Sequence, residues 1–564
     1  MSIEDRVDAW MEPFVVEVAS SLGLRAGSWR GTYTKPPRKE FGDLSSNAAL
    51  EIASKSGANP REVAGRIAGL LPSAPFVERV EVAGPGFINV FLKVDWLYDV
   101  LREVVASGAG YGRAEPTGRS VQVEFVSANP TGPLHIGHAR NAVIGDAVAN
   151  VMEATGWRVE REYYFNDAGR QMDLFGSSVE ARYLELFGRQ AEIPEDGYRG
   201  EYVVEVAKDI AAAFGDSLTD LPSEERHARS IHEGAERVLA MIEATLERFG
   251  VRFDSFFSER TLHESGEIEQ AVGRLRAAGL AYDSEGAVFF RSTSFGDDKD
   301  RVLIRSNGAP TYFAADCAYV IDKFARGFDL LIYVWGADHH GDVVRVKGAA
   351  EALGYDPESL EMVLYQWVSL SRGGEPVGMS KRAGAFVTLD ELIDEVGADA
   401  TRFTLLLRSN DSTLDFDIEA VKRQTMDNPV YYVQYGHARI ASILRRAEEL
   451  GVALRPVEEA DLSLLSTNAE LDLLRLIADL PSEVEHAAEH RAPHRLTHYA
   501  QDLAARFHRF YTECRVISQD AERTQARLWL ALGTKQVLAT ALALIGVGAP
   551  ESMERMERID GGEP

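Results

Sequence analysis

Residues 129–146 read NPTGPLHIGHARNAVIGD and follow the apolar segment VQVEFVSA at 121–128. Apolar positions then recur with helical spacing up to Gly156, and RVEREYYF at 158–165 has the composition of a second strand. A strand, a turn, a helix and a second strand in this order form a βαβ unit. We therefore predict a parallel sheet, with the quoted turn at the carboxyl end of its first strand.

Two histidines, His135 and His138, stand where the helix of this unit begins. Unpaired N–H groups and the helix dipole favour an anion at such a place, and Gly137 lets a ligand approach the backbone closely. Imidazoles there can stabilise the charge that develops on a phosphate during its displacement. The alternative is two ordinary histidines at a helix start. The position directly after an apolar strand favours the phosphate site.

The rest of the sequence indicates three domains, because 564 residues are too many for one hydrophobic core. The sheet pattern resumes at DLLIYVWGA (329–337) and EMVLYQWVSL (361–370). A Gly-rich stretch at 107–120 reads as a linker. We predict an α+β domain over 1–115, an α/β domain over 116–420 with a helical insertion at about 176–300, and an all-helical domain over 421–564.

The net charge of −28 argues against a uniformly basic nucleic-acid binder, although a local basic face remains compatible with it. Cys317 and Cys514 are the only cysteines, which excludes a disulfide framework and a thiolate zinc site. No apolar run reaches membrane-spanning length, and the start MSIEDRVDAWM does not resemble a secretory signal. We expect a soluble, cytoplasmic protein.

The motif HIGH at 135–138 resembles the first signature of the class I aminoacyl-tRNA synthetases. That family implies a second signature, KMSKS, on a loop further along the chain. The stretch GGEPVGMSKRAG at 373–384 is similar to it, but Gly378 stands where the first lysine is usual. A cation for the ATP phosphates must then come from Lys381, Arg382 or elsewhere. We expect Thr388 and Glu391 to form the capping box of the helix that follows this loop.

The wider sequence resembles arginyl-tRNA synthetases, in which loss of that lysine is tolerated. The matching stretches are EFVSANPTGPLHIGHAR at 124–140, YFNDAGRQ at 164–171, WGADHHGDV at 335–343 and YYVQYGHARI at 431–440. The resemblance implies a Rossmann-type catalytic domain and a C-terminal anticodon-binding bundle. It also implies activation of L-arginine by ATP with Mg²⁺, transfer of arginine to tRNA(Arg), and a first step that usually needs the tRNA.

The resemblance also implies roles for individual residues. His135, His138 and Lys381 would act in catalysis. Tyr312 and Asp316 lie one helical turn apart and so share a face, and a carboxylate can take the fork of donors of a guanidinium, so we assign this partner role to Asp316. The implied ATP site is His135, Gly137, His138, Asp338, Met379, Ser380 and Lys381; the implied arginine site is Glu124, Ser127, Asn129, Tyr312, Asp316 and His339.

Two regions are implied to contact tRNA. Phe87 and Asn89 lie in GPGFINVF of the N-terminal domain, and Arg506 and Arg509 lie in the segment 490–515. That segment holds five Arg and four His against two acidic residues, which suits phosphate contacts. Its interleaved aromatic side chains suit base stacking but are better explained as core residues of a helical bundle; they are Tyr499, Phe507, Phe510 and Tyr511.

A zinc site at Asp338, His339, His340 and Asp342 is an alternative that we do not favour, because no spaced partner set completes it. We expect no protein-bound metal, only the Mg²⁺ that accompanies ATP, and we expect a monomer. Three functional alternatives remain. They are a class I synthetase for another amino acid, a small-molecule nucleotidylyltransferase, and a non-catalytic relative that binds tRNA. The helical bundle argues against the second, and the presence of His135, His138 and Lys381 argues against the third.

Overall fold

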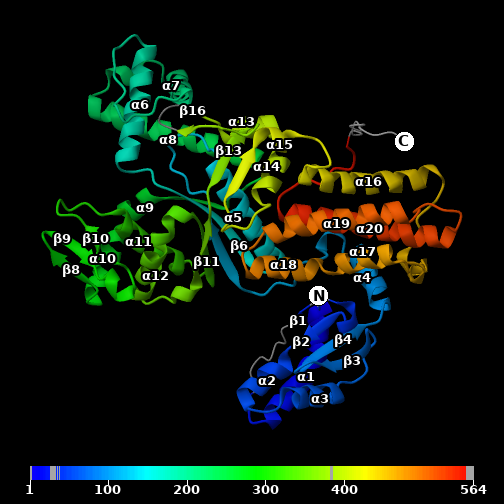
Figure 1. The fold of residues 1–564 in the computed structure, drawn as a ribbon. Helices are drawn as coiled ribbons and strands as arrows, with labels where there is room; N and C mark the ends of the chain where they lie inside the picture. The colour runs from blue at the N-terminus through cyan, green and yellow to red at the C-terminus, as the bar shows by residue number, and fades with distance from the viewer. Residues whose placement is uncertain (1–2, 26–32, 35, 37, 381–384, 554–564) are drawn as a thin grey trace.

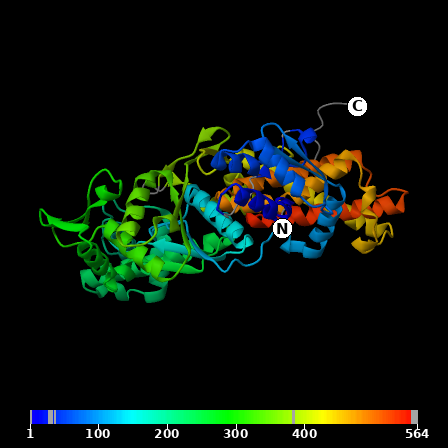
Figure 2. The same ribbon diagram turned by 90° about the horizontal axis from the view of Figure 1, so that it is seen from below.

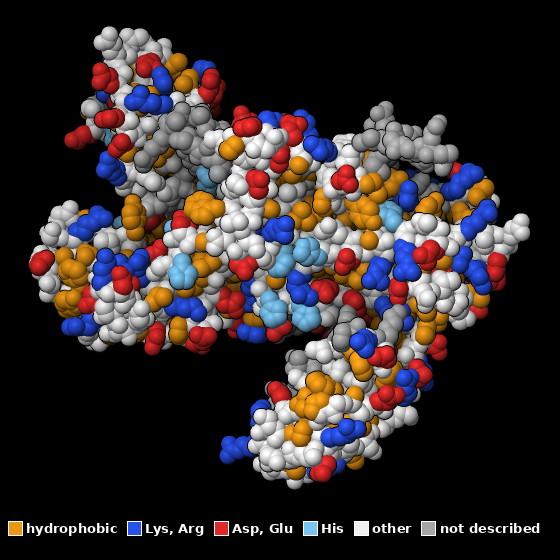
Figure 3. Space-filling view, in the orientation of Figure 1, with side chains coloured by type: hydrophobic (Ala, Val, Ile, Leu, Met, Phe, Trp, Pro, Cys, Tyr) orange, Lys and Arg blue, Asp and Glu red, His pale blue; other side chains and the backbone are white. Residues whose placement is uncertain are grey.

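The computed structural model describes residues 3–25, 33–34, 36, 38–380 and 385–553. Figure 1 shows an elongated molecule in which the central α/β domain and the C-terminal bundle lie side by side, with the N-terminal domain below the bundle. The view from below shows the same long body with the N-terminal domain over the bundle (Figure 2). Acidic and basic side chains are intermixed over the face shown in Figure 3. None of the helices in the described ranges combines the length and apolar composition that a bilayer crossing requires.

The N-terminal domain is an antiparallel sheet of order β1-β2-β4-β3 with three helices. Helix α1 buries Val7, Met11, Val15 and Val18 along one stripe. Asn59 caps α3 by accepting a hydrogen bond from the Arg61 backbone N–H. The elements are α1 (Ile3–Ser21), β1 (Tyr33–Thr34), β2 (Leu44–Ser46), α2 (Ala48–Ser56), α3 (Pro60–Leu70), β3 (Val77–Ala83) and β4 (Phe87–Leu92).

The central α/β domain is built on a parallel sheet of order β12-β11-β5-β6-β7. From β5 the sheet continues through β6 and β7 on one side, and through β11 and β12 on the other. The strand order therefore reverses between β5 and β11, which is where such sheets bind ligands. The strands of this sheet are β5 (Ser120–Glu124), β6 (Arg158–Phe165), β7 (Ser255–Ser258), β11 (Leu330–Gly336) and β12 (Leu360–Tyr365), and helix α5 (Ile136–Ala154) follows β5.

Two insertions flank β7. The first is helical and projects at the top of Figure 1, and the second carries a small antiparallel sheet of order β10-β9-β8. The first comprises α6 (Arg170–Leu186), α7 (Glu201–Phe214) and α8 (Ser223–Arg248). The second comprises α9 (Glu259–Glu264), α10 (Glu267–Ala277), β8 (Ala281–Ser284), β9 (Ala287–Phe290) and β10 (Arg301–Ile304). Helix α11 (Tyr312–Ala325) leads from this insertion to β11, and α12 (His340–Ala352) follows β11.

A connecting region joins the sheet to the bundle. It contains β13 (Val368–Arg372), β14 (Glu375–Pro376), β15 (Met379–Ser380), β16 (Ala385–Phe386), α13 (Leu389–Val396), α14 (Ala398–Leu405), β17 (Leu414–Asp417) and α15 (Ile418–Lys422). The C-terminal bundle contains α16 (Pro429–Glu449), α17 (Asn468–Ala478), α18 (Leu480–Glu489), α19 (His494–Glu513) and α20 (Ala521–Leu544). The expected aromatic core is confirmed for Tyr499, Phe507 and Phe510, which are buried, but is wrong for Tyr511, which is 42% exposed.

Helix α5 lies between the sheet and the bundle. Gly145 faces the ring of Phe125 so closely that a Cβ at this position would lie 2.2 Å from it. On its other side α5 contacts α14, α18 and α20. The helix that carries the two histidines is therefore held between two domains.

The structure corrects three details of the sequence interpretation. The predicted insertion contains β7, a four-residue strand of the parallel sheet, because so short an edge strand has no long apolar run. The segment 361–370 breaks into the separate strands β12 and β13. Helix α4 (Asp95–Ser107), within the predicted N-terminal unit, packs on α17 and α20 of the bundle, and the Tyr98 hydroxyl donates to the Leu465 carbonyl at 3.0 Å.

Candidate active site

A cavity of about 870 Å³ opens at the point where the strand order of the parallel sheet reverses. Its wall combines the ends of β5, β6 and β11, the start of α5, and residues of β10, α11 and α12. The sequence-predicted residues on this wall are Glu124, Ser127, His135, Gly137, His138, Tyr312, Asp316, Asp338 and His339. Chain segments about 200 residues apart thus meet in one site.

The two histidines of the α5 start are held by the backbone. His135 is the N-cap residue, and its Nδ1 accepts the Gly137 N–H at 3.1 Å. The Nδ1 of His138 accepts the His135 N–H at 3.2 Å, and the two rings stack with centroids 3.9 Å apart. In the neutral imidazoles the proton then lies on Nε2, so both rings have a donor suited to a phosphate oxygen. A side chain at Gly137 would meet the His135 ring at 3.0 Å.

The end of β5 has an uncommon backbone conformation. Val126 and Ser127 have φ of 66° and 44°, a region that a β-branched residue such as valine rarely occupies. Asn141 of α5 compensates, because its Oδ1 accepts the Val126 N–H at 2.6 Å and its Nδ2 donates to the Val334 carbonyl at 2.8 Å. This amide links α5 to the ends of both central strands. Strain of this kind is often retained at functional sites.

The second signature is attached to the first. The Leu389 N–H donates to the Leu134 carbonyl at 2.8 Å, and His135 pairs with Thr388 in an isolated bridge. Strands β15, which contains Met379 and Ser380, and β16 form an antiparallel hairpin. Lys381 lies outside the described residues. The expected capping box is confirmed, because the Thr388 N–H donates to the Glu391 carboxylate at 2.7 Å and Thr388 Oγ1 accepts the Glu391 N–H at 3.1 Å.

Tyr312 and Asp316 lie in the first turns of α11 and both reach the cavity. Tyr312 is 59% exposed. Burial and, as a smaller cause, the nearby negative charge of Glu259 raise the pKa of the Asp316 carboxyl to about 8. Without a cation in the cavity, Asp316 is therefore mostly protonated at neutral pH. A guanidinium group would favour its ionised form.

Glu124 is not a free carboxylate. One of its oxygens accepts from Lys323 Nζ at 2.6 Å, and the other accepts from the Ser127 hydroxyl at 3.2 Å. Lys323 is 1% exposed, and its ammonium lies 4.0 Å from the ring centroid of Tyr333. The predicted arginine ligand is thus held by a buried cation beneath the cavity, and Ser127 reaches the substrate space beside it.

The sequence interpretation missed Glu259. This residue is 5% exposed at the carboxyl end of β7, and it accepts a hydrogen bond from the hydroxyl of the cavity residue Tyr164 at 2.6 Å. Its charge acts on Asp316. A carboxylate directly after the short strand-like segment SFFS, comparable with Glu124 at the end of β5, is the signal that would have pointed to it.

Cationic side chains also line the cavity. Arg301 pairs with Asp297 at 2.7 Å, Arg345 pairs with Asp342, and the cavity wall also includes Arg305. The hydrogen bond from His339 Nδ1 to Asp342 at 3.1 Å raises the pKa of the His339 imidazole. Three residues of the zinc alternative, Asp338, His339 and Asp342, are thus paired with one another or with arginine.

Asn129 is not on the cavity wall. It accepts from the Asn166 N–H at 3.2 Å and donates to Gln171 at 2.9 Å, so it supports the loop behind the cavity. Among the predicted tRNA contacts, Phe87 is 36% exposed, whereas Asn89 is buried and accepts from the Ser45 hydroxyl at 2.8 Å. Asn89 is therefore not placed to contact a macromolecule.

A second hollow, of about 780 Å³, lies between α16 and α19. It contains a cluster of Arg439, Arg445, Arg446 and Arg515 with Tyr435 and Tyr511, of which only Arg515 and Tyr511 lie in the segment 490–515 singled out from the sequence. The Arg439 guanidinium lies 4.8 Å from the Tyr435 ring centroid and 5.1 Å from that of Tyr511. The predicted Arg506 and Arg509 are about half exposed on α19 and lie 3.9 Å and 3.6 Å from Asp472.

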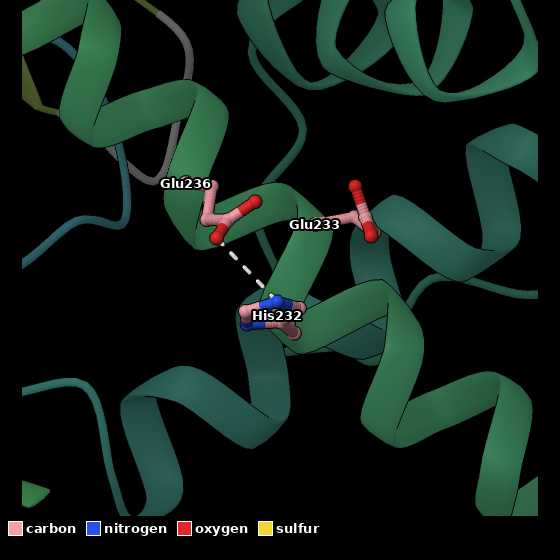
Figure 4. Close-up of side chains that lie close together, drawn as sticks. All are labelled: His232, Glu233 and Glu236. Atoms are coloured by element: carbon pink, nitrogen blue, oxygen red, sulfur yellow. Dashed lines mark ion pairs between the residues drawn. The ribbon is translucent and has the colours of Figure 1, made fainter. Parts of the chain in front are cut away.

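Among the residues that the structure describes, one group of side chains could hold a single cation. This group lies on α8, and none of its members lines the cavity. It consists of His232, Glu233 and Glu236. In Figure 4 His232 faces Glu236, at 3.4 Å, while Glu233 points to the side. Glu233 already binds Arg237 at 2.7 Å and Arg229 at 3.0 Å. These contacts explain the group as helix-surface ion pairs.

Comparison with known proteins agrees with this architecture. Residues 100–440 match the family model described as tRNA synthetases class I (R), catalytic domain. Residues 31–92 match the arginyl tRNA synthetase N-terminal domain, and residues 433–553 match the DALR anticodon binding domain. The arginine–tRNA ligase of Carboxydothermus hydrogenoformans is 51% identical over 520 residues, which cover 92% of this chain and 93% of that protein.

The chain belongs to the arginine–tRNA ligase family. The arginine–tRNA ligase of Heliobacterium modesticaldum is 50% identical over 523 residues, covering 92% of this chain and 93% of that protein. The arginyl-tRNA synthetase structure from Thermus thermophilus has the same fold, with a TM-score of 0.76 at 24% identity; the match covers 97% of this chain and all of that one. The predicted fold class is confirmed. It consists of an N-terminal α+β domain, a Rossmann-type catalytic domain and a C-terminal helical bundle of the anticodon-binding type.

Proposed function

We propose that the cavity at the β5–β11 reversal carries out both steps of the arginine–tRNA ligase reaction. As a member of this family, the chain activates L-arginine with ATP to arginyl-adenylate and pyrophosphate, and then transfers arginine to the 3′ end of tRNA(Arg). The observation that carries the proposal is the shared wall. The anion-binding start of α5 and the acidic face of α11 line one cavity. ATP and arginine can therefore meet with their reacting groups adjacent.

The arginine end of the proposed site is the acidic wall. Asp316 would take the guanidinium fork, with Glu259 adding negative charge from behind Tyr164. Tyr312 would cover the aliphatic stem of the substrate, and His339 would stand near its polar end. Glu124 and Ser127 would bind the substrate's α-amino group, with Lys323 holding the Glu124 carboxylate in place. Asn129 would act indirectly by supporting this loop.

The phosphate end is the start of α5. The Nε2 groups of His135 and His138 would stabilise the charge that builds on the α-phosphate while the arginine carboxylate attacks in line. Gly137 would leave room for the nucleotide, and Asp338 would face its ribose side. Met379, Ser380 and Lys381 of the second signature would contact the phosphates. Mg²⁺ would enter as part of the ATP substrate, bound by phosphate and water oxygens.

The other domains would bind tRNA. The arginine-rich hollow between α16 and α19, with Arg506 and Arg509 nearby, suits phosphates and unstacked bases of the anticodon loop. Phe87 offers an exposed ring on the N-terminal domain. We keep residues 1–115, 116–420 and 421–564 as functional units, although α4 packs on the bundle. A cytoplasmic monomer is part of the proposal, and sedimentation at micromolar concentration would test its oligomeric state.

The test is arginine-dependent exchange of labelled pyrophosphate into ATP, with and without tRNA(Arg). We expect exchange with arginine and tRNA together, and none when citrulline, which is neutral but similar in shape, replaces arginine. Exchange without tRNA would leave the ligase assignment but refute the tRNA-dependent first step. Exchange with another amino acid and not with arginine would refute the proposed pocket.

A further inference from the structure

The mouth of the cavity carries an exposed tryptophan that the roles above do not use. Trp367 lies in the loop between β12 and β13, lines the cavity, and is 62% exposed. Among the large apolar side chains of the described residues, it is the most exposed, and Tyr312 at 59% is the next. The two most exposed apolar side chains of this part of the chain therefore belong to one cavity. Exposed apolar side chains gathered at one cavity mark a binding site.

The backbone under Trp367 is firmly held. Arg140 of α5 is fully buried, and its guanidinium donates to the carbonyls of Gln366 at 2.6 Å and Ser409 at 3.1 Å. The same Nη1 lies 3.4 Å from the Trp367 carbonyl, which also accepts the Leu414 N–H at 3.2 Å. The indole is thus exposed on a rigid loop. A rigid aromatic surface loses little entropy when a ligand stacks on it.

Arg140 also sets where the indole lies relative to the phosphate site. It follows His138 by two residues on α5, so one helix carries both the histidines and the group that holds the loop. Tyr365, two residues before Trp367, brings its hydroxyl within 3.4 Å of the Gly137 carbonyl. This contact therefore ties the chain just before the Trp367 loop to the start of α5.

We propose that Trp367 is a stacking platform for an adenine ring in the aminoacylation reaction, and that Arg140 is its positioning residue. The adenine belongs either to ATP or to the 3′-terminal adenosine of tRNA, the two adenosine-bearing substrates that this site must bind. The inference rests on the proposed function of the cavity. Stacking on an aromatic side chain is strong enough for its loss to change an apparent affinity by about 5- to 100-fold.

The experiment compares Trp367→Ala, Trp367→Phe and a control, Phe187→Ala, which removes an exposed ring (38%) far along the helical insertion. Aminoacylation kinetics give separate KM values for ATP, tRNA(Arg) and arginine. We expect Trp367→Ala to raise the KM for one adenosine-bearing substrate by about 5- to 100-fold. Trp367→Phe should retain most of the affinity, and the KM for arginine should stay within twofold.

Binding of tRNA(Arg) with and without its terminal adenosine identifies the source of the ring. If tRNA supplies it, Trp367→Ala removes the difference between the two RNAs; if ATP supplies it, that difference persists and only the KM for ATP rises. Wild-type KM values for both substrates in Trp367→Ala would overturn the inference. Absence of arginylation by the wild-type protein would instead refute the proposed function.

The role of Arg140 is tested by a double-mutant cycle. Arg140→Lys should raise the KM for the same substrate as Trp367→Ala, with a smaller change in kcat. In the double variant the KM should not exceed that of Trp367→Ala alone, because the two residues act through one contact. Additive effects on the KM would show that Arg140 acts independently of Trp367, and would remove it from the proposal.

Discussion

Lys323 Nζ lies 2.6 Å from the carboxylate of Glu124, and both side chains are buried beneath the substrate cavity. Two aromatic rings, those of Tyr319 and Tyr333, lie 4.5 Å and 4.0 Å from the same ammonium. The pair joins α11, which carries the proposed guanidinium ligand, to the end of β5. Stability and substrate geometry therefore depend on the same contact.

Lys323→Met is expected to destabilise the protein by about 3–5 kcal/mol, because it leaves the Glu124 charge buried without its cation. Calorimetric Tm and the KM for arginine measure the effect, and the KM should rise as the end of β5 loses its support. The matched control is Lys208→Met, which breaks an exposed pair with Glu205 and should leave Tm unchanged. Equal Tm values for the two variants would contradict this account.

Arginine binding is expected to be pH-dependent through Asp316. Its pKa is raised to about 8 by burial and by the charge of Glu259, while a guanidinium needs the ionised carboxylate. Binding at pH 7 should therefore release close to one proton. The affinity for arginine should fall by up to about tenfold per pH unit below pH 8. Calorimetric titration in buffers of different ionisation enthalpy measures the released proton, and a pH-independent affinity between 6 and 9 would refute the assignment.

The Asp316 carboxyl also makes the stability of the protein depend on pH. Its folded-state pKa lies above the unfolded value of 3.8, so its contribution to stability is lost as pH rises from about 4 to about 8. Asp316→Asn should consequently raise Tm at pH 8.5, have little effect at pH 4, and abolish measurable arginine activation. A lower Tm at pH 8.5 would show that the ionised carboxylate is stabilised in the free protein by a contact that this account omits.

His138→Ala is expected to lower kcat for the activation step by about 10²- to 10³-fold while changing the KM for ATP much less. The physical reason is that the His138 donor is aimed at charge that develops only in the transition state. Single-turnover formation of arginyl-adenylate in the presence of tRNA separates the two quantities. Equal losses in rate and in ATP binding would assign His138 to ground-state binding.

Gly546→Ala is expected to weaken the junction between the bundle and α5. Arg402 donates to the Ile545 carbonyl at 3.1 Å and to the Phe249 carbonyl at 3.0 Å, and it also pairs with Asp146 of α5. A Cβ at Gly546 would lie 1.9 Å from this guanidinium. The buried arginine has to move, so we expect a loss of about 1–3 kcal/mol beyond the backbone strain alone.

Gly451→Ala is the matched control for this variant. Gly451 has a φ of +73° and Gly546 a φ of +67°, but no atom lies within 4 Å of a Cβ built at Gly451. Both substitutions therefore carry the strain of a positive φ, and only one crowds Arg402. Urea denaturation compares their free energies of unfolding, and identical losses would show that the Arg402 junction adjusts without cost.

Local pattern was enough to predict several elements of this protein. The alternation around 121–165 predicted the strand, turn, helix and strand that form β5, α5 and β6. Thr388 and Glu391 predicted a capping box at the spacing at which it occurs. The pair Tyr312 and Asp316 predicted a shared helix face, and both residues reach one cavity. In each case the interacting residues are close in the chain, so spacing alone determines whether they can meet.

Contacts between distant segments were not predictable in this way. Strand β7 was missed because four residues show no periodicity, and with it Glu259 was missed. The exposure of Trp367 depends on how Arg140, more than 220 residues earlier, holds its loop. Asn89 was a candidate tRNA contact, yet it is buried in the sheet and accepts a hydrogen bond from Ser45.

The sequence by itself determined the family, the order of the domains and the two signature loops, because these depend on local residue types and their spacing. The tertiary structure decided which charges are shared: Glu124 with Lys323, Asp146 with Arg402, and Asp316 with the field of Glu259. The physical reason is that burial and Coulomb interactions depend on distance in space and on exclusion of water, and neither quantity is written in the spacing of residues along the chain.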